Sequence, residues 1–323
     1  MKFDQLYQLI RADMQHVDVI IRRRLHSDVA LVRQVAEHII QSGGKRLRPA
    51  LVLLTARALG YQGQTHYTLA AVIEFIHTAT LLHDDVVDES SLRRGRDTAN
   101  ALFGNAASVL VGDFLYSRAF QMMVEVGDKR ILQVLADATN VIAEGEVLQL
   151  MNCHNANVDE VRYLQVIRYK TAKLFEAAAR LGAIIGGASA QVEQQLAEYG
   201  MHLGTAFQLI DDVLDYSSSE AETGKHLGDD LAEGKPTLPL IYVMQHGTPE
   251  QSACVRQAIE HGGREDFPHV LAAIRATGAL AHAQQQGAAE AALAKNAIDG
   301  ILPASPYKNS LLELASFAAQ RSF

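Results

Sequence analysis

The 323-residue chain has no tryptophan, only two cysteines and only seven prolines. Cys153 and Cys254 stand about a hundred residues apart without a CxxC motif, which argues against a disulfide scaffold or a zinc knuckle and favours a reducing compartment. The low proline count, together with many Ala, Leu, Gln and Glu residues, favours long helices over a sandwich of short strands. These shortages argue against an all-β fold.

Basic residues are also scarce: the chain has 29 Lys and Arg residues against 37 Asp and Glu residues, which gives a net charge of −8. Proteins that bind nucleic acids neutralise phosphates with clustered Lys and Arg, so we expect no nucleic-acid partner. Residues 1–11 lack the apolar centre of a signal peptide. The most apolar stretch, residues 69–82, contains Glu74 and His77 and is shorter than the roughly 20 residues that span a membrane. We expect a cytoplasmic protein without a transmembrane segment.

Helical periodicity runs along almost the whole chain and breaks mainly at glycine or proline clusters. It predicts helices over residues 3–25, 29–42, 49–59, 68–89, 106–126, 129–151, 159–182, 190–216, 237–245, 249–261, 267–277, 279–298 and 307–320. None of the joints has the composition of an interdomain linker, although the polar loop over 217–236 is longer than the others. We therefore expect an all-α fold with a single domain over residues 1–323.

Two acidic motifs of the form DDxxD follow apolar helical runs. They are Asp84-Asp85-Val86-Val87-Asp88 and Asp211-Asp212-Val213-Leu214-Asp215. Residues four apart share a helix face, so each motif presents a pair of neighbouring carboxylates that repel one another without a cation. Mg²⁺ suits oxygen ligands and commonly shares them with a substrate phosphate. A single DDxxD is more often a solvated helix end, but two copies in the same setting favour a metal site.

The helix that leads to the first motif carries further polar residues. His77 lies two helical turns before Asp84 on the same stripe, and Thr80 lies one turn before it. A lone histidine on an apolar helix is often a hydrogen-bonded core residue, and both interpretations stay open for His77. Glu74 and His77 also form an ExxH match, but a di-iron bundle needs a second such motif, and the sequence contains none.

Basic residues form three groups around these motifs. The first is the glycine-hinged loop GGKRLRP over 43–49, which opens a helix whose N-terminus attracts anions. The second is Arg93-Arg94-Gly95, and the third combines Lys170 and Thr171 with Lys225 and Lys235. Most Lys and Arg side chains are simply solvated. Placed beside acidic motifs, these groups predict two bound diphosphates, one bridged by metal and one held directly by Lys and Arg.

Several motifs in one order cover nearly the whole chain: DDVVD followed by RRG, DDVLD preceded by FQLI, GGKRLRP, YKTA and GKPTLP. In these motifs the chain resembles the trans-prenyl diphosphate synthase family. Longer stretches such as IEFIHTATLLHDDVVDES and NVIAEGEVLQLMN are most similar to its bacterial octaprenyl members. The resemblance implies a large helical bundle of the isoprenoid synthase type around a central active-site cavity. It also implies a homodimer and transient contact with a membrane when the product is released.

The resemblance also implies the residue roles. The residues that would bind the diphosphate of isopentenyl diphosphate are Lys45, Arg48, His77 and Arg94. The residues that would contact the allylic prenyl diphosphate are Arg93, Lys170, Thr171, Gln208, Lys225 and Lys235. The catalytic set would be Asp84, Asp85, Asp88, Asp211, Asp212, Asp215 and Lys170. The metal ligands would include Asp84, Asp88 and Asp211, for about three Mg²⁺ ions per active site.

The reaction implied by the resemblance is the stepwise addition of isopentenyl diphosphate to an allylic diphosphate such as farnesyl diphosphate, which makes the side chain of a quinone. Charge stabilisation on the leaving diphosphate lets the allylic C–O bond ionise, and an apolar cavity protects the cation from water. Small residues at Ala79 and Thr80 predict an open top to the tunnel for the growing chain. Met123 is a candidate for its floor, with ordinary core packing as the alternative.

Three alternative functions stay open, and the motifs fit the first of them best. The same chemistry with a hepta-, nona- or shorter prenyl product fits the same motifs. Terpene cyclases share an aspartate-rich first motif, but their second metal site typically has an Asn/Asp, Ser/Thr, Glu pattern, which DDVLD does not match. A non-catalytic subunit of a heteromeric synthase predicts eroded motifs, whereas all of them are intact.

Overall fold

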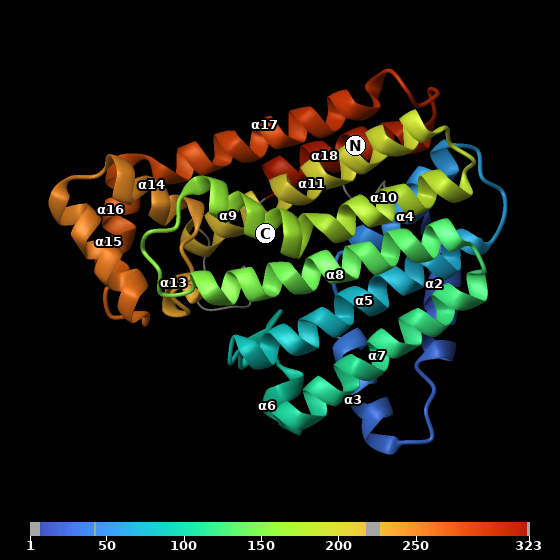
Figure 1. Ribbon diagram of the computed structural model, residues 1–323, viewed down its shortest axis with the longest axis horizontal. Helices are drawn as coiled ribbons and strands as arrows, with labels where there is room; N and C mark the ends of the chain where they lie inside the picture. The colour runs from blue at the N-terminus through green and yellow to red at the C-terminus, as the bar shows by residue number, and fades with distance from the viewer. Residues whose placement is uncertain (1–6, 42, 218–226, 322–323) are drawn as a thin grey trace.

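The computed structural model describes residues 7–41, 43–217 and 227–321. The elements in chain order are α2 (Arg11–Arg24), α3 (Ala30–Gln41), α4 (Leu47–Ala58), α5 (Thr65–Val87), β1 (Leu92–Arg93), β2 (Arg96–Asp97), α6 (Ala99–Phe103), α7 (Asn105–Val126), α8 (Lys129–Asn152), α9 (Glu160–Ile167), η1 (Arg168–Ala172), α10 (Lys173–Ile185), α11 (Ala190–Ser217), α13 (Asp229–Ala232), α14 (Leu238–His246), α15 (Pro249–His261), α16 (Phe267–Thr277), α17 (Ala279–Asp299) and α18 (Pro306–Gln320). Figure 1 shows the long helices running roughly side by side, with α14, α15 and α16 grouped at one end. The prediction of an all-α fold is confirmed.

Side-chain caps and glycines set many helix ends where the sequence predicted them. Asp128 accepts hydrogen bonds from the second and third backbone N–H groups of α8 at 2.8 and 3.4 Å. Thr248 and Gln251 form a capping box at the start of α15. Gly127 ends α7 in the left-handed region, at a φ of 74°. A cap of this kind is worth about 1 kcal/mol, so these residues help to separate the bundle into discrete helices.

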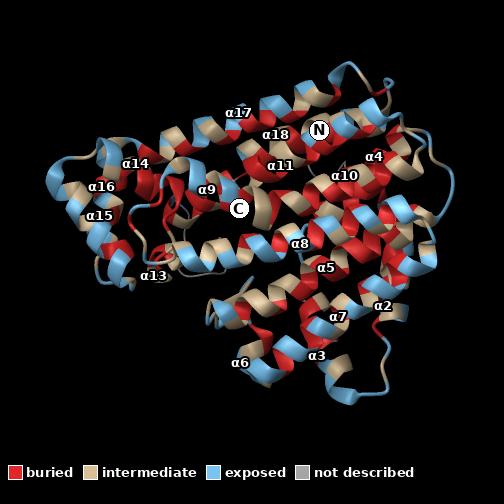
Figure 2. Cartoon of the chain, viewed as in Figure 1, coloured by how far each residue is buried: buried red, intermediate tan, exposed pale blue. Residues whose placement is uncertain are grey.

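The centre of the bundle is α5, whose apolar residues between Leu69 and Ile76 are all fully buried. A helix that is apolar on every side must be surrounded by other helices. The main core joins α5 to α2, α3, α4, α7, α8, α10, α11, α17 and α18. Figure 2 shows the buried residues on the inner faces of these helices and the exposed ones on the outside.

Two smaller apolar clusters lie beyond the main core. One joins α13, α14, α15 and α16, and the other joins α9, α11, α14 and α17. The long helices α11 and α17 contribute residues to the main core and to both smaller clusters. These two helices therefore connect the α14–α16 end to the rest of the bundle.

Three features differ from the predicted element boundaries. The helix predicted over 159–182 is interrupted by the π-helical turn η1, which carries the YKTA segment. The joint after the first acidic motif contains the hairpin of β1 and β2 and the short helix α6. The loop after the second motif contains the single turn α13. Periodicity does not reveal such short elements, because none is long enough to show a repeating pattern.

Candidate active site

The first acidic motif closes α5, with Asp84 and Asp85 in the last turn and Asp88 as the C-cap. Asp84 and Asp88 line a cavity of about 810 Å³, where their side chains are 16% and 17% exposed. Asp85 is fully buried and turned away from its two neighbours. The i, i+4 spacing thus gives two carboxylates to the cavity and one to the protein interior.

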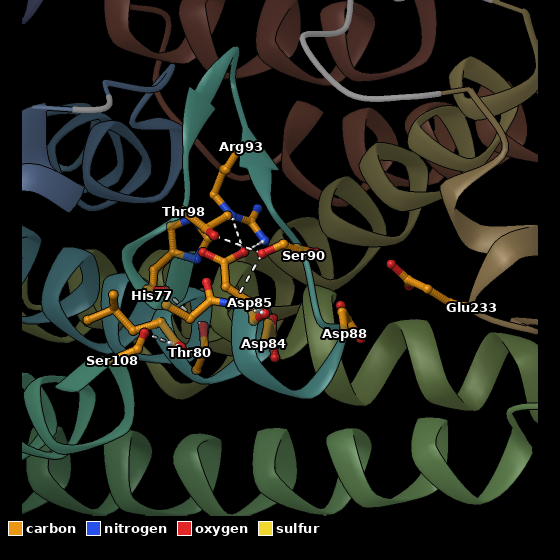
Figure 3. A network of polar contacts seen from close by, with 12 residues as sticks. His77, Thr80, Asp84, Asp85, Asp88, Ser90, Arg93, Thr98, Ser108 and Glu233 are labelled. Atoms are coloured by element: carbon orange, nitrogen blue, oxygen red, sulfur yellow. Dashed lines mark hydrogen bonds and ion pairs between the residues drawn. The ribbon is translucent and has the colours of Figure 1, made fainter. Parts of the chain in front are cut away.

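The hairpin of β1 and β2 holds the buried carboxylate. Arg93 Nε donates to Asp85 Oδ1 at 2.7 Å, and Arg93 Nη2 lies 2.6 Å from the same oxygen, as Figure 3 shows. Burial acts to lower the pKa of Arg93, but the carboxylates of Asp85, Asp84 and Asp88 raise it overall. Arg93 also lines the 810 Å³ cavity, so the same side chain fixes the motif and faces the site.

The second acidic motif lies in the last turns of α11, and all three of its aspartates border the cavity, although the middle one is buried. Asp211 and Asp215 line the 810 Å³ cavity. Asp212 is buried, where it accepts hydrogen bonds from Tyr163 Oη at 2.6 Å and Gln208 Nε2 at 2.9 Å. Burial raises the pKa of Asp212 to about 8 against the opposing effect of these two donors. Gln208, predicted as a ligand of the allylic diphosphate, therefore also positions this carboxylate.

Arg321, near the end of the chain, also lines the cavity beside the second acidic motif. Arg321 pairs with Asp211 and donates from Nη2 to the carbonyl of Phe207 at 2.7 Å. Its guanidinium lies 3.7 Å from the centre of the Phe207 ring. Sequence reasoning missed Arg321, because the 110 residues that separate it from Asp211 leave no local pattern. The contact depends on α18 packing beside α11.

Two lysines connect the first motif to glutamates outside any motif. Lys170 Nζ lies 2.6 Å from Glu146 Oε2 and 3.6 Å from Asp84 Oδ1. Lys235 Nζ lies 3.1 Å from Asp88 Oδ2 and pairs with Glu233. Sequence reasoning identified both lysines but neither glutamate.

The other basic groups that line the cavity come from the glycine-hinged loop and the hairpin. Arg46 precedes α4 with a φ of 42°, and Gly44 has a φ of 143°, so the loop turns Lys45 and Arg48 toward the hairpin. Arg48 Nη1 lies 3.1 Å from His77 Nε2, and the guanidinium lies 4.4 Å from the centre of the Phe175 ring. Burial lowers the pKa of His77, and the nearby arginines lower it further, so the ring is neutral at pH 7.

Arg94 approaches this loop from the hairpin. A Cβ on Gly44 would lie 2.5 Å from Arg94 Nη1, so glycine, which also suits the φ of 143°, lets the guanidinium approach without displacement. Glu74 faces the same arginines, with Oε1 3.8 Å from Arg46 Nε. Burial raises the pKa of Glu74, while Arg46, Arg48 and Arg94 oppose that shift. The i, i+3 spacing of Glu74 and His77 already predicted that they lie side by side, although only a di-iron role was considered for the pair.

A second, larger cavity of about 1870 Å³ shares Asp84, Asp88 and Thr80 with the first. It extends between α5, α7 and α8 as far as Arg24 and Glu125. Its wall on α7 combines the apolar or aromatic side chains of Tyr116, Phe120 and Val124 with polar ones at Asp113, Ser117, Arg118, Gln121 and Glu125. A polar cavity and a long apolar cavity therefore meet at the first acidic motif.

The predicted tunnel residues divide between this cavity and the core. Thr80 lines both cavities, but Ala79 and Met123 are fully buried in the main core and line neither. On the same helix as Met123, the side chains of Tyr116, Phe120 and Val124 border the larger cavity instead. Met123 therefore has the core position that the alternative interpretation gave it.

The donor set fits a hard divalent cation. The four outer aspartates, Asp84, Asp88, Asp211 and Asp215, offer only oxygen atoms and come from the ends of two helices that meet at one cavity. Mg²⁺ is commonly held by one or two carboxylates together with substrate phosphates and water. Within the described ranges, no group of three or more His, Cys, Asp and Glu side chains forms a complete metal site by itself.

Most predicted site residues meet at the 810 Å³ cavity. Those that line it are Lys45, Arg48, His77, Thr80, Asp84, Asp88, Arg93, Arg94, Lys170, Thr171, Gln208, Asp211, Asp212, Asp215 and Lys235. Asp85 lies behind this wall, and Lys225 falls outside the described residues. None of the described helices is both long and apolar enough to cross a lipid bilayer.

Comparison with known proteins agrees with this geometry. The family model described as polyprenyl synthetase matches residues 29–275. Octaprenyl diphosphate synthase of Escherichia coli (strain K12) is 53% identical over 322 residues, which is 99% of each chain. All-trans-nonaprenyl-diphosphate synthase (geranyl-diphosphate specific) of Rhodobacter capsulatus is 45% identical over 97% of this chain and 96% of its own.

Among solved structures, polyprenyl synthase from Caulobacter crescentus CB15, complexed with calcium and isoprenyl diphosphate, superposes with a TM-score of 0.96. It is 45% identical to this chain, and the match covers 99% of this chain and 98% of that one. The match extends over almost all of the bundle, including both acidic motifs. This chain belongs to the polyprenyl synthetase family and has its isoprenoid synthase fold.

Proposed function

We propose that the protein is a long-chain all-trans-polyprenyl diphosphate synthase whose product is octaprenyl diphosphate. Four outer aspartates from two helices face one cavity that is cationic on one side and continues into an apolar cavity on the other. This juxtaposition carries the proposal, because it separates two diphosphates and gives the prenyl chain a place to grow. The identity to E. coli octaprenyl diphosphate synthase supports the product length, and the quinone side chain is the proposed use of the product.

The residues divide the reaction between the two ends of the polar cavity. Lys45, Arg48 and Arg94 hold the diphosphate of isopentenyl diphosphate, with His77 beside Arg48 as a neutral hydrogen-bonding partner. Lys170 and Lys235 lie at the first motif, where they stabilise negative charge on the departing allylic diphosphate. The isopentenyl double bond then attacks the allylic cation, and the proton lost afterwards passes to the released diphosphate.

Mg²⁺ is the proposed cofactor, with about three ions per active site. Asp84 and Asp88 on one side, and Asp211 on the other, are the proposed ligands. When bound, the ions would neutralise charge on the allylic diphosphate and favour its departure. The calcium recorded with the Caulobacter crescentus relative supports a divalent cation in this family.

Growth of the prenyl chain is assigned to the 1870 Å³ cavity. The cavity begins at Asp84 and Thr80 and continues along α7, so each added isoprene unit moves the tail away from the metal site. Phe120→Ala should lengthen the products, because the side chain borders this cavity, whereas Met123→Ala should leave the distribution unchanged. Chromatography of the dephosphorylated products measures both. Longer products from Met123→Ala and an unchanged distribution from Phe120→Ala would instead indicate that Met123 forms the floor of the tunnel.

A homodimer is the proposed assembly. Exposed apolar side chains concentrate on α7 and α8, at Val109, Leu110, Phe120, Val124, Val147, Leu150 and Met151. Several of them also border the larger cavity, so a second copy seated on this face would both bury them and close the cavity to water. Sedimentation should give twice the chain mass for the native protein and a shift toward the monomer for Leu110→Asp. A monodisperse monomer of the native protein would contradict this assembly.

Three further assignments complete the proposal. One domain over residues 1–323 is supported by α11 and α17, which contribute to all three apolar clusters. A cytoplasmic location is supported by Cys153 and Cys254, both free thiols in the structure. Transient membrane contact is proposed for the release of a product whose long hydrocarbon tail is insoluble in water.

Incubation of the purified protein with farnesyl diphosphate, labelled isopentenyl diphosphate and Mg²⁺ tests the function. The expected product, after dephosphorylation, is an all-trans octaprenol. A shorter or longer prenol would keep the chemistry and change the product. A cyclised hydrocarbon, or no turnover without a second subunit, would reject the proposal in favour of a cyclase or a non-catalytic subunit.

A further inference from the structure

Two glutamates outside the recognised motifs hold the two lysines of the active site in the same way. Lys170 lies between Asp84 and Glu146, and Lys235 lies between Asp88 and Glu233. In each case the glutamate is the nearer partner, at 2.6 Å for Glu146 against 3.6 Å for Asp84. The glutamates come from unrelated parts of the chain, since Glu146 is on α8 and Glu233 is the C-cap of α13.

The backbone conformation around each lysine favours the contact between its ammonium group and the glutamate. Lys170 lies in the π-turn η1, and a Cβ on the neighbouring Gly145 would lie 2.6 Å from its backbone nitrogen. Glycine at 145 therefore lets α8 approach the turn and carries Glu146 to the ammonium group. A π-turn within a helix is uncommon and often marks a functional position.

The loop that carries Lys235 is fixed independently. The backbone N–H of Lys235 donates to the carbonyl of Asp230 at 2.8 Å, and the carbonyl of Gly234 accepts from the backbone N–H of His154 at 2.8 Å. Gly234 has a φ of 68° and lies against the His154 ring, so the turn requires glycine. The contact with Glu233 then fixes the side chain of Lys235, as these bonds fix its backbone.

The cluster carries more negative than positive groups, because four carboxylates share two ammonium groups. Burial raises the pKa of Glu146 to about 7, and the charge of Asp84 adds to the effect. Burial also raises the pKa of Glu233 to about 7, while Lys235 opposes the shift. A crowded carboxylate of this kind costs stability, which argues for a role beyond holding the fold together.

We propose that Glu146 and Glu233 are positioning residues that hold the ammonium groups of Lys170 and Lys235 at the site of the allylic diphosphate. A lysine side chain has a flexible four-carbon stem and loses entropy when it is fixed. If the aspartates bind metal, they no longer restrain the lysines. Each glutamate then remains to keep its ammonium group directed at the leaving group. The readout of this role in turnover rests on the proposed synthase function.

The test compares Glu146→Gln and Glu233→Gln with the matched control Glu144→Gln, an exposed residue on the same helix as Glu146. Gln keeps the size of the side chain and removes its charge. Each active-site variant should lower kcat about 10- to 100-fold and raise the KM for farnesyl diphosphate several-fold, roughly the loss expected when a supporting residue no longer orients its partner. The KM for isopentenyl diphosphate should stay unchanged, because the two glutamates pair with Lys170 and Lys235 and not with Lys45, Arg48 or Arg94 among the described residues.

A double-variant comparison separates positioning from other roles. Because Glu146 acts through Lys170, the pair Lys170→Met and Glu146→Gln should be no more than about twofold slower than Lys170→Met alone. If the two substitutions instead lower kcat by independent factors that multiply in the double variant, the proposal is overturned. A tenfold rise in the Mg²⁺ concentration that gives half-maximal activity, seen in Glu146→Gln but not in Glu144→Gln, would also overturn it, since it would make Glu146 a metal ligand.

Calorimetric titration with inorganic diphosphate and Mg²⁺ gives a readout that does not depend on turnover. Glu146→Gln and Glu233→Gln should bind diphosphate several-fold more weakly, with thermal unfolding temperatures no lower than that of the wild type, because neutral Gln removes the cost of the crowded carboxylate. Unchanged binding and unchanged kcat in an active enzyme would reject the positioning role and leave the synthase function standing. A wild-type protein without turnover would reject the function, and the titration would still decide the role of the glutamates.

Discussion

The two ends of α5 carry buried polar clusters of opposite character. At the start of the helix, Asp13 receives two hydrogen bonds from Arg57, at 2.7 and 3.0 Å, and one from Tyr67 at 2.9 Å, and His66 lies beside them. At the other end, Asp84 and Asp88 face a cavity. The first cluster is closed by its own residues, whereas the second leaves its carboxylates accessible to a ligand. Burial and charge therefore indicate a functional site only where a cavity gives a ligand access.

Asp85 combines features of both ends. It belongs to the acidic motif by sequence, but its buried ion pair with Arg93 resembles the pair of Asp13 and Arg57. Asp212 has the same place in the second motif, yet its partners Tyr163 and Gln208 are uncharged. Two motifs of identical pattern thus have different electrostatic surroundings, and the comparison leads to the following predictions.

The largest expected effect separates activity from stability at the active end. Asp84→Ala should lower turnover by about 10³-fold or more, because it removes a proposed metal ligand next to the leaving group. Its urea midpoint should stay close to that of the wild type, since Asp84 faces the cavity. The matched control is Asp137→Ala, at an exposed position of α8. Retained activity in Asp84→Ala would refute the role of the first motif.

The opposite end should give the opposite result. Asp13→Asn removes the charge that balances the Arg57 guanidinium, whose side chain is 16% exposed, and should cost about 3 kcal/mol of unfolding free energy. The specific activity of the folded fraction should be unchanged. Urea denaturation measures the loss, with the exposed Asp28→Asn as its control. A stability loss no larger than that of the control would show that this cluster does not hold the helices together.

The two middle aspartates give a sharper test of the same idea. Asp85→Asn should destabilise the protein by about 3 kcal/mol, because it leaves the mostly buried Arg93 charge unbalanced. Asp212→Asn should cost only about 1 to 2 kcal/mol, because its partners are uncharged and lose hydrogen bonds alone. Parallel urea titrations compare them. Equal losses would mean that the charge of Arg93 does not distinguish the motifs.

The smallest expected effect concerns pH. Burial and the charge of Arg57 lower the pKa of His66 to about 4, below its ordinary value of 6.5. Between pH 6.5 and 4 the unfolded chain takes up this proton before the folded chain does, so stability falls with pH by about 1 kcal/mol or less, because solvent screens part of the effect, and it is unaffected above pH 6.5.

His66→Phe should remove this part of the pH dependence. Neither ring nitrogen of His66 has a hydrogen-bond partner among the described residues, so replacing His66 with Phe breaks no hydrogen bond. Urea midpoints at pH 7.5 and pH 5 should lie closer together in the variant than in the wild type. The exposed His261→Phe is the control. An unchanged difference between the two pH values would assign the acid sensitivity to another group.

Much of the site could be predicted from local sequence patterns. The i, i+4 spacing placed Asp84 with Asp88, and the glycine loop placed Lys45 and Arg48 at a helix start. What the sequence could not show are contacts between distant segments, such as Arg321 with Asp211, and Glu146 with Lys170. These contacts depend on how the helices pack.

The tunnel shows a different limit. The core residue Met123 lies within one helical turn of the cavity residues Phe120 and Val124, and only packing decides which of these apolar side chains borders the cavity. The same limit applies to η1, because a π-turn shifts helical phase without a change in hydrophobic pattern. Sequence patterns fix the spacing along a helix, whereas its rotation is fixed by its neighbours.

The central claim is that one cavity holds two diphosphates by different means, and calorimetry tests it directly. Isopentenyl diphosphate, titrated with and without Mg²⁺, should bind with affinities that agree within about threefold, since Lys45, Arg48 and Arg94 are proposed to hold it directly. A non-reactive farnesyl thiodiphosphate should lose about 100-fold or more in affinity when EDTA removes the metal, since Asp84, Asp88 and Asp211 are proposed to bind it through Mg²⁺. Equal dependence of both ligands on the metal would contradict the account.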